Sequence, residues 1–103
     1  MKVDLCFTHI NDQTYFFYRV RSGSRLPKAF AISAQDLIEI FWLLRSRGYK
    51  EELKKWSKGA YPIMTATYGY TFDRVKKEDA SLIMSRFGEP LIKELERECL
   101  RKE

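Results

Sequence analysis

The segment 13–21 places aromatic and basic side chains at alternate positions. Tyr15, Phe17, Arg19 and Arg21 recur every second residue, so a β-strand would carry all four on one face. Aromatic rings stack on unpaired bases, and guanidinium groups bind phosphates. The spacing therefore predicts a nucleic-acid-binding face on a sheet. The alternative is that a helix covers this face and the rings belong to the core, because large exposed apolar patches are uncommon on monomers.

Further basic residues follow this strand. Arg25 and Lys28 lie in a loop that begins with Ser22 and Gly23, and the segment 45–58 carries six basic residues against two acids. Such an excess favours an anionic partner, although a solvated lysine face is the alternative. The predicted nucleic-acid-binding residues are Tyr15, Phe17, Arg19, Arg21, Arg25, Lys28, Arg45, Arg47, Lys50, Lys54 and Lys55.

Catalytic chemistry finds little support in the residue pattern. His9 is the single histidine, and a catalytic base needs an oriented partner that the sequence does not indicate. Cys6 and Cys99 match no zinc or redox spacing, so we expect two free thiols in a reducing compartment. No protease, hydrolase or calcium-loop motif occurs. We expect no enzyme activity, no metal and no cofactor.

Length and composition indicate one globular domain spanning residues 1–103. Hydrophobic residues make up 45% of the chain and charged residues 32%, a mixture typical of folded proteins rather than disordered ones. The formal net charge is +5. No apolar run approaches the roughly 20 residues that span a bilayer, and the first residues lack a signal-peptide pattern. We therefore expect a cytoplasmic protein that does not bind membranes.

The elements that would position these residues begin with a β-hairpin over residues 2–21. A two-residue turn at Asn11-Asp12 pairs residues whose numbers add to 23. Val3 then faces Val20, and Asp4 faces Arg19 as a salt bridge on the other face. A one-residue slip would mix the two faces, so the pattern specifies this register. Alternation around Phe30 predicts a short third strand.

The rest of the chain predicts four helices and one further strand. Ser33 is the expected N-cap of a helix that runs to about Arg47, followed by a short helix over 49–57. Residues 62–72 read as a strand in which Gly69 marks a bulge or divides the strand into a hairpin. The last two helices begin near Lys77 and at Pro90. The prediction is an α+β fold, order β-β-β-α-α-β-α-α, with about four helices on a small antiparallel sheet.

For function, the sequence favours a small non-enzymatic protein that binds nucleic acid. The alternative is a protein-binding inhibitor or adaptor of the kind that viruses and mobile elements encode against host defence. Anti-CRISPR proteins exemplify that type, although no motif links this chain to them. Trp42 and Trp56 are the expected interface residues, because Trp is enriched at interface hot spots. The apolar helix around Trp42 would equally suit a homodimer. A small enzyme is the least favoured reading.

Overall fold

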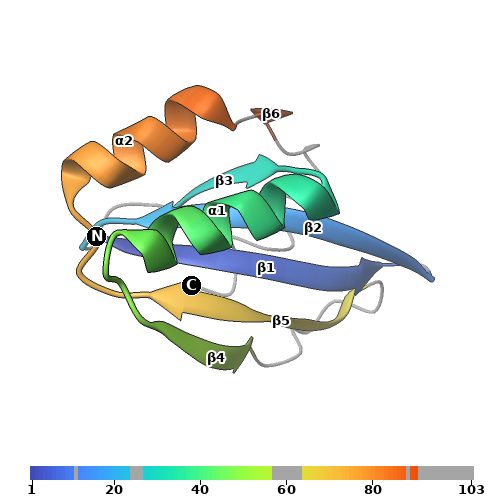
Figure 1. Ribbon diagram of the computed structural model, residues 1–103. Coiled ribbons are helices and arrows are strands. Elements are labelled where there is room, and N and C mark those ends of the chain that lie inside the picture. The colour runs from blue at the N-terminus through green and yellow to red at the C-terminus, as the bar shows by residue number, and fades with distance from the viewer. Residues whose placement is uncertain (11, 24–26, 57–63, 88, 91–103) are drawn as a thin grey trace.

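The computed structural model describes residues 1–10, 12–23, 27–56, 64–87 and 89–90 (Figure 1). Within them the chain forms one antiparallel sheet and two helices, in the sheet order β4-β5-β1-β2-β3-β6. β4 and β6 are therefore its edges. The elements are β1 (Lys2–Ile10), β2 (Gln13–Arg21), β3 (Lys28–Ala31), α1 (Ala34–Ser46), β4 (Glu51–Trp56), β5 (Met64–Phe72), α2 (Lys77–Arg86) and β6 (Glu89–Pro90).

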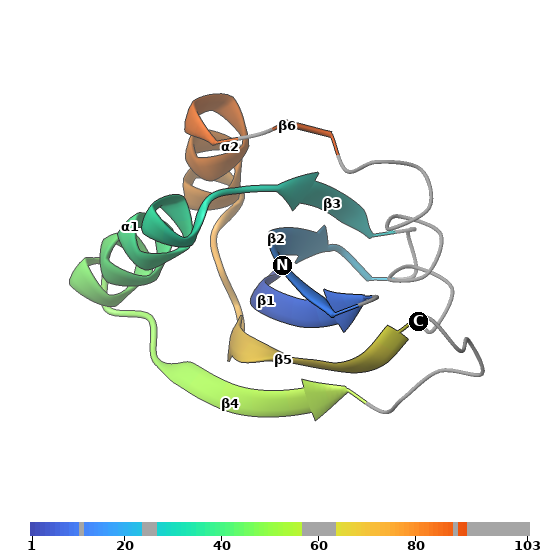
Figure 2. The same ribbon diagram turned by 90° about the vertical axis from the view of Figure 1, so that its right-hand side faces the viewer.

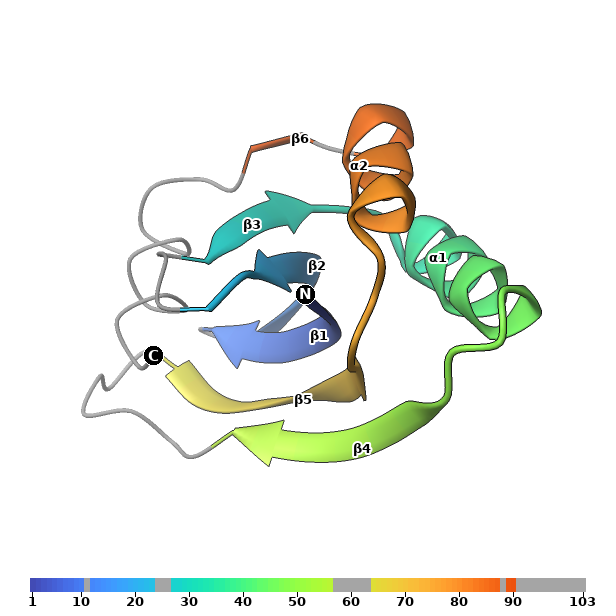
Figure 3. The ribbon, with the colours of Figure 1, turned by 90° about the vertical axis from the view of Figure 1, so that its left-hand side faces the viewer.

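Both helices pack against the same face of the sheet, as the side views in Figures 2 and 3 show. On this helix-covered face, apolar side chains from the sheet and the helices form the main core. The members that are at most 5% exposed are Val3, Leu5, Tyr18, Val20, Ile40, Leu44, Phe72, Val75, Ala80 and Ile83. No helix of the described residues is long and apolar enough to cross a membrane.

The N-terminal hairpin confirms the predicted register. Val3 pairs with Val20, Asp4 with Arg19, and every other pair from Lys2↔Arg21 to Ile10↔Gln13 adds to 23. Asp12 in the turn has a φ of 66°, a left-handed conformation that Asp tolerates better than most residues. The alternation of residue types thus fixes which side chains share each face.

Helix α1 begins and ends where the sequence indicates. The Ser33 hydroxyl accepts a hydrogen bond from the Asp36 backbone N–H at 3.0 Å, which satisfies one of the unpaired donors of the first turn. Gly48 follows the helix with a φ of 92°, a conformation that favours glycine and turns the chain toward β4.

The predicted helix over 49–57 is wrong, because Glu51–Trp56 forms strand β4. Leu53 and Trp56 have helical spacing, which suggested a helix, yet so short a helix is marginal by itself. As a strand, the segment instead pairs with β5 from Glu51↔Phe72 to Trp56↔Thr67. Pairing with a neighbouring strand therefore overrides the local helical pattern.

The C-terminal helix prediction also fails where it can be compared with the structure. Pro90 belongs to the two-residue strand β6 and pairs with Phe30, instead of opening a helix. Proline has no N–H to donate and is tolerated at such a sheet edge. Residues 91–103, which hold the rest of that predicted helix, lie outside the described part of the chain. The helix predicted from Lys77 is confirmed as α2. The fold is thus a larger sheet with fewer helices than expected.

Gly69 neither bulges nor divides its strand. It lies within the continuous strand β5, opposite Cys6 on β1. A Cβ at this position would collide with the backbone carbonyl of Leu5. Glycine is needed here because the two backbones approach closely. The register irregularity between β1 and β5 falls instead between Thr8 and Ile10.

The sheet face turned away from the helices is also buried along its central strands. Cys6, Thr8 and Phe17 have no exposed area, and Thr67 is 3% exposed. Both faces of β1 and β2 therefore contribute buried side chains. This second face is the one on which the sequence predicted an aromatic and basic binding surface.

Candidate functional site

The four alternating residues of β2 do not form an exposed platform in this structure. Phe17 is fully buried and Arg19 is 2% exposed. Tyr15 is half-buried, and its hydroxyl donates a hydrogen bond to Gln13 Oε1 at 2.8 Å. Arg21 is also half-buried. Phe17 is therefore a buried side chain and not part of a stacking platform. The expected helix cover is not what buries it, because both described helices lie against the opposite face of the sheet.

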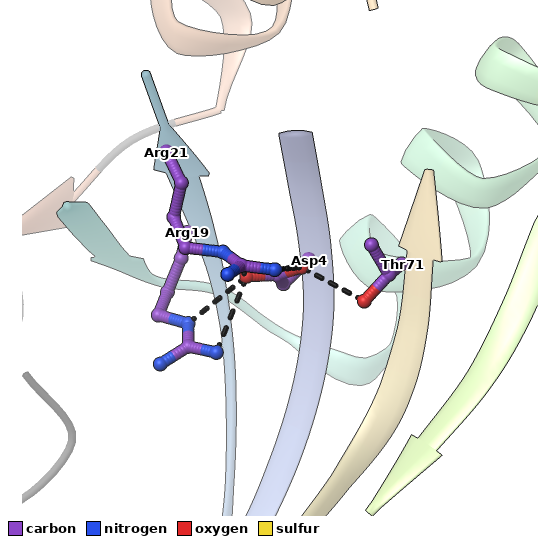
Figure 4. Close-up of polar contacts among 4 residues, drawn as sticks. All are labelled: Asp4, Arg19, Arg21 and Thr71. Atoms are coloured by element: carbon purple, nitrogen blue, oxygen red, sulfur yellow. Dashed lines mark hydrogen bonds and ion pairs between the residues drawn. The ribbon is translucent and has the colours of Figure 1, made fainter. Parts of the chain in front are cut away.

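Asp4 holds the two arginines of this face together (Figure 4). Its Oδ2 lies 3.2 Å from Arg19 Nε and 2.6 Å from Arg21 Nε, and its Oδ1 lies 3.0 Å from Arg21 Nη2. Thr71 on β5 donates its hydroxyl to Oδ1 at 2.9 Å. A carboxylate buried in this way needs opposite charges and hydrogen-bond donors to offset its lost hydration. These two guanidinium groups thus serve a buried ion-pair cluster.

Much of the basic segment 45–58 is neutralised by acidic neighbours. Each of three basic residues has a carboxylate partner: Arg45 Nη1 lies 2.5 Å from Glu51 Oε2, Arg47 Nη1 lies 2.7 Å from Asp79 Oδ1, and Lys54 Nζ lies 3.2 Å from Glu52 Oε1. The Arg45 hydrogen bond holds the pKa of Glu51 below its ordinary value. These pairs lower the positive field that the segment offers to a phosphate backbone.

The other predicted residues are dispersed over the molecule. Lys28 on β3 and Lys50 before β4 are exposed. Lys55 is exposed, with its Nζ 5.5 Å from the centre of the Tyr68 ring. Arg25 lies outside the described residues, and Trp56 is placed only as the last residue of β4. Among the described residues, Lys28 on β3 is therefore separated from Lys55 on β4 by three intervening strands of the sheet.

An apolar surface lies instead where α1 adjoins β4. Three large side chains stay exposed there: Ile38 at 54%, Trp42 at 61% and Leu53 at 69%. We call these three residues the α1–β4 surface. Trp42 was predicted as an interface residue, whereas Ile38 and Leu53 were not.

Half-buried aromatic rings connect the two parts of the α1–β4 surface. The Phe41 ring contacts both Trp42 and Tyr70, with 5.2 Å between ring centres in each pair. Tyr70 is in turn the cross-strand partner of Leu53. The ion pair between Arg45 and Glu51 also joins α1 to the start of β4. The Phe41–Tyr70 contact and the Arg45–Glu51 ion pair thus join α1 to the β4–β5 pair next to Leu53.

The outer edge of β4 adjoins this surface. The sheet order places β4 at one end, with β5 on its inner side and no described strand on its outer side. Glu52, Leu53, Lys54 and Lys55 are all exposed. An edge strand presents backbone N–H and C=O groups that can pair with another chain. The arrangement can therefore accept an added strand together with apolar side chains.

Two other places have polar side chains but no evident chemistry. His9 Nδ1 lies 2.9 Å from the Thr14 hydroxyl at the exposed end of the hairpin. A depression of about 580 Å³ lies between the start of α1 and the end of α2, lined by Ser33, Asp36, Ser85 and Arg86 among others. In the portion of the chain with described positions, no three His, Cys, Asp or Glu residues group closely enough to hold a metal ion.

Comparisons with known proteins give no family. No protein-family model, curated protein or solved structure matches the chain.

Proposed function

We propose that this chain is a protein-binding module that acts by binding rather than by catalysis, through the α1–β4 surface. The observation that carries the proposal is the exposure of Ile38, Trp42 and Leu53 beside β4, whose outer edge pairs with no other strand of the described residues. Single exposed apolar residues are common on proteins and need no explanation. Here three large ones occupy adjoining elements that aromatic contacts connect. Trp is also the residue type most enriched at interface hot spots.

The edge of β4 defines the chemistry of the partner. An extended segment that adds to an edge strand gains affinity from backbone hydrogen bonds and specificity from alternate side chains. Opposite β4, such a segment would need an apolar residue facing Leu53. It would need basic residues facing Glu51 and Glu52 and acidic residues facing Lys54 and Lys55, since unlike cross-strand charges stabilise pairing. The proposed partner is therefore a protein that contributes a strand of this pattern.

Site-specific photo-cross-linking in the native cells tests this proposal. A photoreactive residue replaces Trp42 in one variant and Leu53 in another, and exposed Glu78 on α2 provides the control position. We expect protein adducts at 42 and 53 and few at 78. Equal adducts at all three positions, or adducts at 78 alone, would contradict a binding surface between α1 and β4.

Nucleic-acid binding is a second candidate function. It is favoured by the net charge of +5 and by the exposed lysines Lys2, Lys28 and Lys50. Binding to labelled DNA and RNA at low and high salt tests it, because phosphate contacts release counterions and weaken as salt rises. The variant that tests this candidate carries both Lys28→Ala and Lys50→Ala, which should weaken binding if these lysines contact phosphates. Arg19 and Arg21 are unsuitable, since their loss would leave the buried Asp4 carboxylate without its positively charged partners.

A further inference from the structure

The residues of β4 are complementary to themselves when the strand is reversed. From Glu51 to Lys55 the order is two acids, one leucine and two lysines. An antiparallel copy of the same strand, centred on Leu53, sets Glu52 against Lys54 and Glu51 against Lys55. Leu53 then faces Leu53 of the copy. Every charged residue in this stretch meets a residue of opposite charge.

From this complementarity we infer that the partner of β4 is a second copy of the chain, which joins two sheets into one across a twofold axis at Leu53. The inference rests on the proposed function, because it names the partner of the same surface. Twofold symmetry makes the interface self-complementary, so each charge pair occurs twice.

Charge also selects this register over the other symmetric ones. A twofold axis between two antiparallel edge strands passes through a pair of residues that have the same number. Centring the pair on Glu52 would oppose two carboxylates, and centring it on Lys54 would oppose two ammonium groups. Like charges directly opposite each other destabilise a sheet. Parallel in-register pairing would oppose like charges at every charged position. Of the antiparallel arrangements centred on residues 51–55, only the one centred on Leu53 avoids repulsion.

The exposure of the side chains agrees with this arrangement. The side chains of Glu52 and Lys54 are 70% and 45% exposed, and both project from the sheet face opposite the helices. In the dimer they would form a ring of four alternating charges around the axis. Leu53, at 69% exposed, lies on the helix-covered face. Because the twofold axis is perpendicular to the sheet, the α1 helices of the two copies lie on this same face, one on each side of the Leu53 pair.

A charge-exchange experiment tests the dimer. The molar mass of the intact protein is measured by light scattering and by sedimentation over a range of concentrations. We expect the wild type to dimerise, and Glu52→Lys or Lys54→Glu alone to give monomers, because each variant opposes like charges twice. Mixing the two variants should restore a dimer of one copy of each, since Glu52→Lys then faces Lys54→Glu. Glu78→Lys, which changes the net charge as Glu52→Lys does, should leave the dimer intact.

An engineered disulfide locates the axis. Directly opposite residues of an antiparallel pair have Cα atoms about 4.5–5.5 Å apart, within the range that a disulfide bridges. Leu53→Cys should therefore form a covalent dimer under mild oxidation, beyond the background of the wild type. Glu78→Cys should not.

Three results would overturn the inference. These are a wild type that is monomeric at the highest concentration measured, a dimer unaffected by Glu52→Lys and Lys54→Glu, and no restored dimer when the two variants are mixed. Failure of the proposed function gives a different result, namely equal adducts at positions 42, 53 and 78 or adducts at 78 alone. If position 42 or 53 instead cross-links to a different protein while the purified chain is monomeric, the binding surface is supported and the second copy is excluded as its partner.

Discussion

Asp4 and Arg19 face each other directly across β1 and β2, and their side chains are 0% and 3% exposed. The pairing follows from the hairpin register, yet the burial does not. At a protein surface such an ion pair contributes little to stability, whereas in a buried site each partner depends on the other. The strand that looked like a binding face is therefore held in place by a charge cluster inside the protein.

Asp4→Asn tests the structural role of this cluster. The substitution keeps the shape of the side chain but removes the negative charge that compensates Arg19. Breaking one partner of a buried ion pair costs about 3–5 kcal/mol in the free energy of unfolding. Urea denaturation measures this quantity. Glu78→Gln, at an exposed position of α2, should cost less than about 0.5 kcal/mol. Equal effects of the two substitutions would mean that the Asp4 cluster is not structurally important.

Gly69→Ala tests the close approach of β5 to β1. The added Cβ would meet the backbone carbonyl of Leu5, which lies in a central strand and cannot move as a flexible side chain could. We expect a loss of about 3 kcal/mol or more, at the upper end for overpacked sites. In contrast, Gly23→Ala adds a Cβ in open space at a φ of 59° and should cost about 1 kcal/mol from backbone strain alone. A cost at 69 no greater than at 23 would contradict the close approach.

The parts of the fold that sequence predicts well are those in which one local pattern dominates. The hairpin register follows from alternation over nine residues in each strand, and α1 has both a cap at Ser33 and a terminating Gly48. β4 was missed because Leu53 and Trp56 also fit helical spacing. The segment forms a strand because it pairs with β5. This contact joins segments that a local sequence pattern does not relate to each other.

The candidate site was predictable only in part, for a related reason. The sequence shows that Tyr15, Phe17, Arg19 and Arg21 share a face, but burial of that face depends on tertiary packing. Trp42 was identified from its residue type. The order of charges around Leu53 is visible in the sequence. It indicates a pairing surface only once the structure places β4 at the edge of the sheet. Whether an arginine lies in a buried ion pair or is exposed to a partner therefore depends on long-range packing, which the local sequence does not contain.

We expect Asp79 on α2 to stabilise the packing of α2 against the segment that follows α1. It accepts hydrogen bonds from the Tyr49 hydroxyl at 2.6 Å and from Arg47 Nη1 at 2.7 Å, and it is 7% exposed. Asp79→Ala removes both bonds and should lower the free energy of unfolding by about 2–3 kcal/mol. A double-mutant cycle with Tyr49→Phe should give a coupling energy of about 1 kcal/mol. Additive effects would show that the hydroxyl bond to Asp79 contributes no stability of its own.

Two tyrosines should make the fold sensitive to alkali. Burial raises the pKa of Tyr18, whose hydroxyl donates to the Phe87 carbonyl, and burial together with the Asp79 hydrogen bond raises the pKa of Tyr49. A phenol whose pKa is higher in the folded state stabilises the protein fully below its unfolded pKa of about 10, and that contribution is lost as the pH rises further. The free energy of unfolding should therefore decrease above about pH 10, while the phenolate absorbance of both residues appears later than that of exposed tyrosines. Tyr18→Phe should remove the larger part of this alkaline loss. An unchanged pH dependence in that variant would show that Tyr18 does not control it.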